Sequence, residues 1–318
     1  MNVINRILCP VDFSEHSRRA LEQAVVLARQ YDATLRVLHV FTTPSAMAAV
    51  AGDGSFVPVE NPAVSASYRA DREVELSCFV AAVVPADVTV SREVAEGPAA
   101  AIILQTAAAL PADLIVMGTH GRSGVRRFLV GSVTEHVLRR SSCPVLTVPP
   151  RSPAPVVRPR RILCPIDFSR ASNRALAFAV SVARESSAEL IVLHAIDVHP
   201  DAFRRGLIDL PAYRATALNS GREELEQTVR RFTGGYTNIR ESVVFGKPST
   251  EILRLAAEED VDLIFMGLHG RTSADLFFFG STTQHVVREA ACPVVTIGVQ
   301  ESARSRRELT NQEQVISA

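Results

Sequence analysis

The chain of 318 residues lacks an excess of charge of either sign and lacks a long apolar run. Basic and acidic residues number 34 each, so the composition predicts no surface for nucleic acid or anionic membranes. No apolar run approaches the roughly twenty residues that a membrane-spanning helix needs. The start of the chain, Met1 to Arg6, leads directly into an expected strand without a signal peptide. We therefore expect a cytoplasmic protein without nucleic-acid or membrane partners.

Common catalytic and cofactor motifs are also missing. The sequence has no G-x-G-x-x-G after its first expected strand, no G-x-x-x-x-G-K-[ST], no H-E-x-x-H and no paired C-x-x-C. Lys247 is the only lysine, so arginines and backbone amides must supply the donors at any two equivalent phosphate sites. His120 and His269 could meet a phosphate, transfer a proton or only pack a loop. The five cysteines have no metal-like spacing, which predicts reduced, buried thiols.

What the sequence does contain is the same glycine spacing twice. Gly118-Thr-His-Gly121, nine residues and Gly131-Ser132 recur as Gly267-Leu-His-Gly270, nine residues and Gly280-Ser281. The segment Arg6-Ile-Leu-Cys-Pro-Val-Asp-Phe-Ser14 likewise recurs as Arg161-Ile-Leu-Cys-Pro-Ile-Asp-Phe-Ser169. A duplicated domain explains both repeats.

The spacing of each glycine motif predicts a phosphate site. The first glycine ends an apolar run of strand length, and the last glycine precedes a serine that has an acid or amide three residues on, as in Ser132 to Glu135 and Ser281 to Gln284. This is the pattern of a capping box that opens a helix. The unpaired amides and the positive dipole end of such a helix stabilise a phosphate. The alternative is that the glycines only shape tight turns and the serines only cap.

An aspartate follows the first strand of each repeat. The strand ends at Pro10 or Pro165, and Asp12 or Asp167 comes next but one. In a doubly wound sheet, ligands bind beyond the carboxyl ends of the strands, so we expect Asp12 and Gly118 on one edge. The carboxylate there could accept hydrogen bonds from an adenine amino group or a ribose hydroxyl. The alternative is a further capping interaction.

Strands and helices alternate along both halves, which indicates parallel sheets with helices on both faces. In the first half we expect strands at Val3–Cys9, Thr34–Val40, Val88–Val94, Asp113–Met117 and Pro144–Val148, and helices at Ser17–Tyr31, 65–83, Pro98–Ala109 and Ser132–Arg140, with an irregular excursion at 42–62. The second half repeats this order from Arg161 to Ile297, with an excursion at Asp197–Tyr213. The predicted units are a domain at 1–149, a stiff Pro-rich linker at 150–159, a domain at 160–298 and a polar, disordered tail at 299–318.

The pattern G-2x-G-9x-G-[ST], the opening I-L-x-P-x-D-[FS]-S and the closing C-P-V strand together resemble the universal stress protein family, here as two domains in tandem. The resemblance covers residues 4 to 149 and 160 to 298. It implies an α/β fold of two Rossmann-like, adenine nucleotide alpha hydrolase-like domains, each with a five-stranded parallel sheet flanked by helices. Because both glycine motifs are present, it also implies the branch of the family that binds ATP.

The family's nucleotide contacts carry over onto both halves of this sequence. In the first half the resemblance implies Pro10, Asp12, Val40, Met117, Gly118, Gly121, Arg122, Gly131, Ser132 and Val133. In the second half it implies Pro165, Asp167, Ala195, Met266, Gly267, Gly270, Arg271, Gly280, Ser281 and Thr282. Magnesium or manganese could accompany the triphosphate, held by its phosphates and by water; we expect no protein metal ligand.

The closing strands, Pro144–Val148 and Pro293–Ile297, predict how the halves join. Both are short and apolar, and in the family topology both lie at sheet edges, which are prone to aggregate unless paired. Single-domain universal stress proteins resemble homodimers joined through these strands. The tandem chain therefore resembles a covalent dimer, an intramolecular pseudo-dimer, and association of two chains into a homodimer stays open.

Three functions remain. We favour a nucleotide-sensing regulatory module of the stress response, with a regulatory protein partner of unknown identity, because the phosphate cradle is complete and no catalytic residue is evident. The alternatives are a slow ATPase or nucleotidyl-transfer enzyme, and a chaperone-like stress protein in which the nucleotide is structural.

Overall fold

The computed structural model describes residues 4–42, 48–50, 56–58, 62–120, 130–150, 152, 154–197, 210–268 and 280–298. The strands are β1 (Arg6–Val11), β2 (Thr34–Phe41), β3 (Ala48–Val50), β4 (Phe56–Pro58), β5 (Val90–Glu96), β6 (Leu114–Gly118), β7 (Val145–Val148), β8 (Arg161–Pro165), β9 (Glu189–Ile196), β10 (Ile239–Phe245), β11 (Leu263–Gly267) and β12 (Val294–Ile297). The helices are α1 (Glu15–Tyr31), α2 (Pro62–Ala81), α3 (Ala99–Ala109), α4 (Ser132–Arg140), α5 (Arg170–Ser186), α7 (Leu210–Thr233), α8 (Pro248–Glu258) and α9 (Ser281–Glu289).

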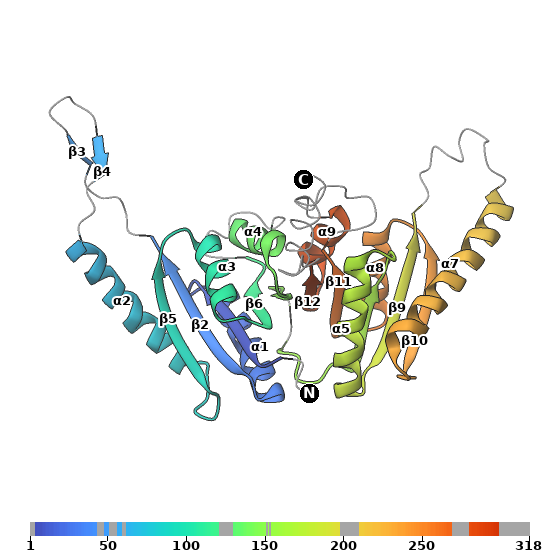
Figure 1. Ribbon diagram of the computed structural model, residues 1–318, viewed down its shortest axis with the longest axis horizontal. Helices are drawn as coiled ribbons and strands as arrows, with labels where there is room; N and C mark the ends of the chain where they lie inside the picture. Colours follow the sequence, from blue (N-terminus) through green and yellow to red (C-terminus); the bar gives the residue numbers. More distant parts are fainter. Residues whose placement is uncertain are drawn as a thin grey trace, which may run out of the picture.

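One ten-stranded sheet runs through both halves of the protein in the order β10-β9-β8-β11-β12-β7-β6-β1-β2-β5. All neighbours within each half are parallel, and β12 pairs with β7 in the antiparallel sense. The two halves therefore stand side by side about this central pair (Figure 1). The predicted pair of five-stranded Rossmann-like domains is confirmed, and so is the predicted pairing of the closing strands.

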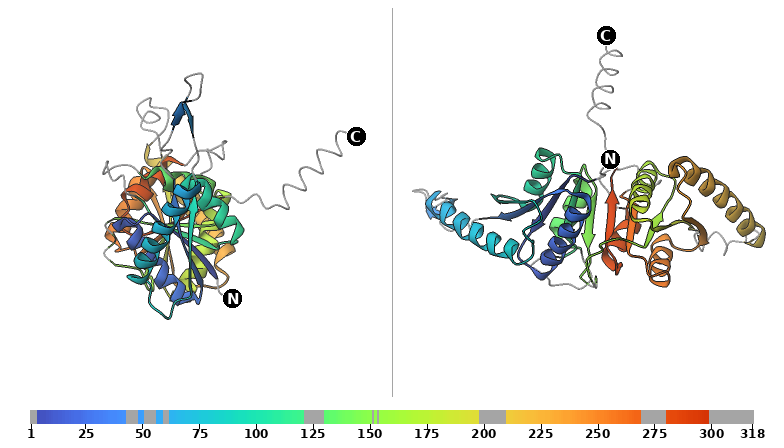
Figure 2. Two further views of the ribbon diagram at one scale, coloured as in Figure 1. Left: turned by 90° about the vertical axis from the view of Figure 1, so that its left-hand side faces the viewer. Right: turned by 90° about the horizontal axis from the view of Figure 1, so that it is seen from below.

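The helices cover both faces of the sheet. One buried cluster unites α1, α2, α5 and α7 with the side chains on one face, and a second unites α3, α4, α8 and α9 with those on the other. Alternation along β1 shows the division, since Ile7 and Cys9 belong to the first cluster and Leu8 to the second. Each cluster draws residues from both halves, so the core continues across the join. Figure 2 shows the helices on the two faces of the shared sheet.

The join between the halves is buried and hydrogen-bonded through side chains. The Thr147 hydroxyl donates to the carbonyl of Val294 at 3.1 Å, and the Thr296 hydroxyl donates to the carbonyl of Val145 at 3.3 Å. All four residues are at most 3 % exposed. These reciprocal bonds add to the backbone ladder between β7 and β12 and fix its register.

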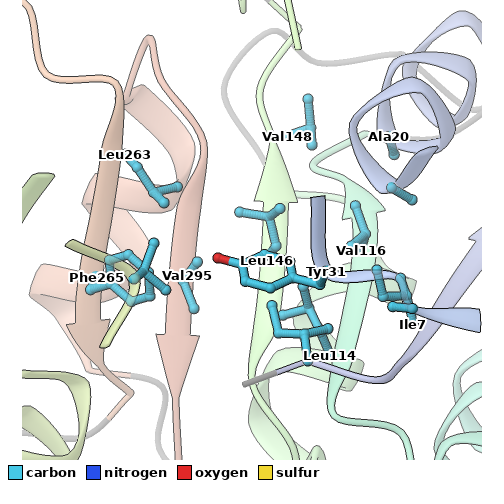
Figure 3. Packing of buried hydrophobic residues seen from close by; sticks show 14 of the residues in the cluster. Ile7, Ala20, Tyr31, Leu114, Val116, Leu146, Val148, Leu263, Phe265 and Val295 are labelled. Carbon is cyan, nitrogen blue, oxygen red and sulfur yellow. The ribbon is translucent and has the colours of Figure 1, made fainter. Parts of the chain in front are cut away.

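Apolar contacts extend the join on one face of the sheet. Leu146 lies opposite Val295 in the ladder, and both are buried. Tyr31 of α1 lies beside Leu146, with its hydroxyl directed toward the strand that carries Val295 (Figure 3). Burial and the nearby Glu185 carboxylate of α5 raise the pKa of Tyr31. Helices of both halves therefore contribute to the join as well as the two strands.

The linker is fastened to α1. Gln23 is 2 % exposed, and its side-chain amide donates to the carbonyl of Val156 at 3.1 Å and accepts from the Val156 amide at 2.7 Å. The Arg19 guanidinium donates to the carbonyl of Pro150. These bonds satisfy linker backbone groups that no strand or helix pairs.

Several predicted boundaries are wrong. The first strand is Arg6–Val11 instead of Val3–Cys9. Helix α1 begins at Glu15 instead of Ser17, because Ser14 is its N-cap and accepts from the Ser17 amide at 3.2 Å. The excursion at 42–62 is not wholly irregular, because β3 and β4 pair within it. Other ends differ by a few residues, as boundary assignments commonly do. The predicted tail at 299–318 lies outside the described residues.

The cysteines match the prediction in part. None of the five forms a disulfide, and burial raises the pKa of the Cys9 and Cys164 thiols. Cys143 and Cys292 are half-buried, whereas Cys78 is exposed on α2, so the prediction of a buried thiol is wrong there. In the part of the chain that the structure describes, no helix is both long and apolar enough to cross a membrane.

Candidate functional site

The turn after β1 places a carboxylate at the sheet edge. Asp12 Oδ1 accepts hydrogen bonds from the amide of Ser14 at 3.1 Å and from its hydroxyl at 2.5 Å. In the second half, Asp167 Oδ1 accepts from the amide of Ser169 at 3.0 Å. Each aspartate therefore supports the cap of the helix that follows, as the alternative interpretation held. The same bonds fix the carboxylate at the carboxyl end of the strand.

The residue between aspartate and serine is a phenylalanine in a left-handed backbone conformation. Phe13 and Phe168 both have φ of 64°, which costs free energy for any residue with a Cβ. The Phe13 ring stacks on His39 at 4.1 Å between centroids, and the Phe168 ring lies 4.5 Å from His194. The Nδ1 of His39 lies 2.8 Å from the carbonyl of Val11. Packing against a fixed imidazole offsets the backbone strain and sets the turn.

The end of β6 is tied to the start of α4. The Gly131 amide donates to the carbonyl of Thr119 at 2.8 Å, and the Thr134 hydroxyl donates to the carbonyl of Gly118 at 2.9 Å. Gly131 is therefore the N-cap, without a side-chain cap, and Ser132 is already the first helical residue. The predicted capping box is wrong, because the bond from Gly131 to Thr119 fixes the cap one residue earlier. The Ser132 side chain is exposed instead of capping the helix.

The second half repeats this arrangement. The Gly280 amide donates to the carbonyl of Leu268 at 3.3 Å, and the Thr283 hydroxyl donates to the carbonyl of Gly267 at 2.9 Å. Gly280 is the N-cap of α9, so the capping box predicted at Ser281 is wrong for the same reason.

The first glycine of each motif has a packing role. A Cβ added to Gly118 would lie 3.0 Å from the carbonyl oxygen of His16, and one added to Gly267 would lie 2.7 Å from the amide nitrogen of Ser172. Glycine thus lets the strand end approach the start of α1 or α5. This packing role is separate from the predicted ligand contact, which stays a prediction for both glycines.

A cavity of about 290 Å³ opens where these elements meet in the first half. Every predicted first-half residue that the structure describes lines it, namely Pro10, Asp12, Val40, Met117, Gly118, Gly131, Ser132 and Val133. It lies between the ends of β1 and β6, where the strand order changes direction and ligands bind in such sheets. The other two predicted residues, Gly121 and Arg122, lie outside the described residues.

The cavity has further lining residues that were not predicted as ligand contacts. They are Val11, Ser17, Leu38, Ala99, Ile103, His120 and Thr134. The repeat carries a signal for several of them, because Ser17, Leu38, Ile103 and Thr134 recur as Ser172, Leu193, Ile252 and Thr283. The identity of these pairs between the halves could have added them to the site.

The lining divides into an apolar and a polar part. Leu38, Val40 and Ile103 supply aliphatic surface, while Asp12 supplies a carboxylate. The N-terminus of α4 opens onto the same space at Ser132, with the positive end of the helix dipole and unpaired amides. The volume is near the lower end of the range of about 300–1,000 Å³ for small-molecule sites. The lining therefore offers aliphatic surface for a flat, largely apolar group and helix amides for an anion.

The second half holds the corresponding residues at the corresponding strand ends. Pro165 ends β8, Met266 and Gly267 end β11, and Gly280 caps α9. Asp167, Ala195, Ser281 and Thr282 are half-buried or exposed beside them. Gly270 and Arg271 lie outside the part of the chain that the structure describes. Lys247 is the N-cap of α8, at the place that Pro98 takes before α3.

Fold and cavity together define a class, tandem Rossmann-like domains that share one sheet and open a pocket at the strand switch point. Comparison with known proteins names the family. The model of the universal stress protein family matches residues 4–149 and 159–298, and the chain belongs to this family of stress-response proteins.

Individual relatives agree with this assignment. A universal stress protein of Methanocaldococcus jannaschii is 31 % identical over 144 residues, which are 43 % of this chain and 81 % of the relative. A second from the same organism is 29 % identical over 154 residues, covering 43 % of this chain and 94 % of that protein. The crystal structure of a universal stress protein from Archaeoglobus fulgidus aligns with a TM-score of 0.61 at 21 % identity, covering 93 % of this chain and 97 % of that one. At that identity the structure shows the fold alone.

Proposed function

We propose that this universal stress protein binds ATP and acts as a nucleotide-sensing regulatory module. The observation that carries the proposal is the single cavity lined by all the described first-half residues that the sequence pattern predicted. These residues come from the ends of β1, β2 and β6 and from the start of α4, and only the fold brings them together.

The two kinds of lining residue match the two parts of a nucleotide. The aliphatic residues Val40, Leu38 and Ile103 can pack on the adenine ring, and the Asp12 carboxylate can accept from an adenine amino group or a ribose hydroxyl. The phosphates would lie at the N-terminus of α4, where backbone amides and the helix dipole stabilise an anion. The exposed Ser132 hydroxyl at this end is a further donor.

The second half repeats the turn, the glycine cap and the threonine bond, so we propose a second nucleotide site there. Magnesium or manganese could bind at both sites through the triphosphate and water alone, since these ions commonly keep waters and phosphate oxygens as ligands. Among the residues that the structure describes, no group of three His, Cys, Asp or Glu side chains is placed to hold a metal.

The test uses Gly131 instead of Gly118, because a side chain at Gly118 would disturb the packing of α1. Gly131 has φ of −57° and ψ of 141°, which any residue can adopt. We expect Gly131→Leu to fill the first cavity and Gly280→Leu to block the proposed second site, with loss of ATP binding by titration calorimetry in the double variant. The matched control is the double alanine variant, which adds little volume and should retain binding; its Cβ at position 280 meets the Leu268 carbonyl oxygen at 3.2 Å just as that of leucine does, so the comparison isolates the larger side chain.

A competition titration between ATP and NAD tests which nucleotide the site prefers, because the proposal requires ATP to bind more tightly than NAD. Unchanged ATP affinity in a folded double leucine variant would refute the proposal. Chromatography of the nucleotide after incubation separates binding from hydrolysis, since a regulatory module should return ATP intact.

A further inference from the structure

Two histidines from separate elements meet beside the first cavity. His16 lies in the first turn of α1, and His120 follows β6 and lines the cavity. Their ring centroids are 5.7 Å apart with 48° between the ring planes. The pair is not duplicated in the second half, because Ala171 stands at the position that corresponds to His16.

The spacing of the rings suits a shared metal ion. Zinc binds imidazole nitrogens at about 2.0–2.1 Å, so two imidazoles on one tetrahedral ion have ring centroids roughly 5 to 5.5 Å apart. The observed separation lies close to this range. A small rotation of either side chain would bring the rings to it.

The hydrogen bonding of both rings leaves nitrogen atoms available. The Nδ1 of His16 is buried and has no hydrogen-bond partner among the described residues, which is costly for a polar atom. The Nδ1 of His120 lies 2.9 Å from the Thr119 hydroxyl. With the proton on this Nδ1 and donated to Thr119, the Nε2 of His120 carries a free lone pair, the arrangement common for metal-ligating histidines.

We propose that His16 and His120 together bind a transition-metal ion of the zinc and cobalt class, and that the phosphates of the bound nucleotide complete its coordination. This inference rests in part on the proposed function. Imidazole selects zinc, cobalt or nickel over magnesium. Within the described residues, no third His, Cys, Asp or Glu joins the pair, so phosphate oxygens and water must fill the other positions. The first site thereby accepts a zinc-class ion besides magnesium or manganese, whereas the second half, with Ala171 in place of His16, lacks this pair.

The experiment uses Co²⁺ as the probe, because tetrahedral Co²⁺ absorbs visible light. The full chain is titrated with Co²⁺ alone and again with ATP present. The variants are His16→Ala, which installs the residue of the second half, and His120→Ala. His136→Ala is the matched control, since His136 lies on α4 and is half-exposed but is not one of the residues that line the cavity.

We expect wild type and His136→Ala to show one tetrahedral Co²⁺ spectrum, and His16→Ala and His120→Ala to lose it. ATP should raise the Co²⁺ affinity of wild type within the range of about 5- to 150-fold that is typical of coupled sites. A Co²⁺ spectrum and affinity unaffected by either substitution, with and without ATP, would overturn the metal site while leaving the proposed function intact. If ATP binds to no form of the protein but the Co²⁺ spectrum still depends on both histidines, the proposed function fails and the metal pair stands.

Discussion

Charge introduced into the central strand pair should separate the two halves of the protein. The change is Val145→Glu together with Val294→Glu, one in β7 and one in β12. Both valines are 1 % exposed, and each lies across the ladder from a buried threonine, Thr296 or Thr147. We expect the double variant to be strongly destabilised and to aggregate or expand.

The magnitude follows from burial. A fully buried valine contributes about 1.5–3 kcal/mol, so losing two removes roughly 3–6 kcal/mol. Each glutamate would also bring a carboxylate into the core, which costs several kcal/mol more per ion. The total is comparable with the whole stability of a typical domain, about 5–15 kcal/mol. Small shifts of the neighbouring side chains cannot compensate a loss of stability of this size.

The assay combines urea denaturation with small-angle scattering. The double alanine variant is one control, because it removes methyl groups without adding charge and should lose less stability while staying compact. Val157→Glu is the other control, because this valine is 61 % exposed and the substitution should have little effect. A double glutamate variant as stable and as compact as wild type would show that the join does not depend on the buried strand pair.

Three further outcomes are expected. Gln23→Ala leaves both linker groups of Val156 unpaired, so it should cost about 1–3 kcal/mol in urea denaturation and speed linker cleavage by protease; unchanged cleavage would argue against the fastening. Thr134→Val removes the buried bond to Gly118 and should lower stability by about 1–3 kcal/mol, which equal denaturation midpoints would contradict. Because the folded-state pKa of His120 is lowered, its contribution to stability is full above the unfolded pKa near 6.5 and is lost as pH falls below it; His120→Gln should flatten that loss, and an identical pH profile would count against it.

The sequence determined the fold class because its signals are local and occur twice. Apolar runs of strand length alternate with helical segments, and the two repeats reinforce each other. The glycine spacing and the aspartate after β1 marked the edge of the sheet that carries the cavity. The pairing of the closing strands followed from the hazard of an unpaired apolar edge.

Local capping was harder to predict. The sequence around Ser132 predicts a capping box with Ser132 as the N-cap. In the structure the N-cap is Gly131, whose amide donates to the carbonyl of Thr119. That bond joins segments on either side of the loop, and no short pattern contains it. Gly118 was predicted as a ligand contact; it lines the cavity, and the structure adds a packing reason for glycine through the close approach of α1.

The sequence by itself therefore determined the two domains, the sheet edge that carries the cavity and eight of the fifteen described residues that line it, because repeats and period-two patterns are local properties of the chain. Only the tertiary structure decided which residues that are distant in sequence contact each other. It gave the buried threonine bonds between β7 and β12, the fastening of the linker by Gln23, and the meeting of His16 with His120. Each of these joins residues that are distant along the chain, and packing of the whole sheet fixes their separation.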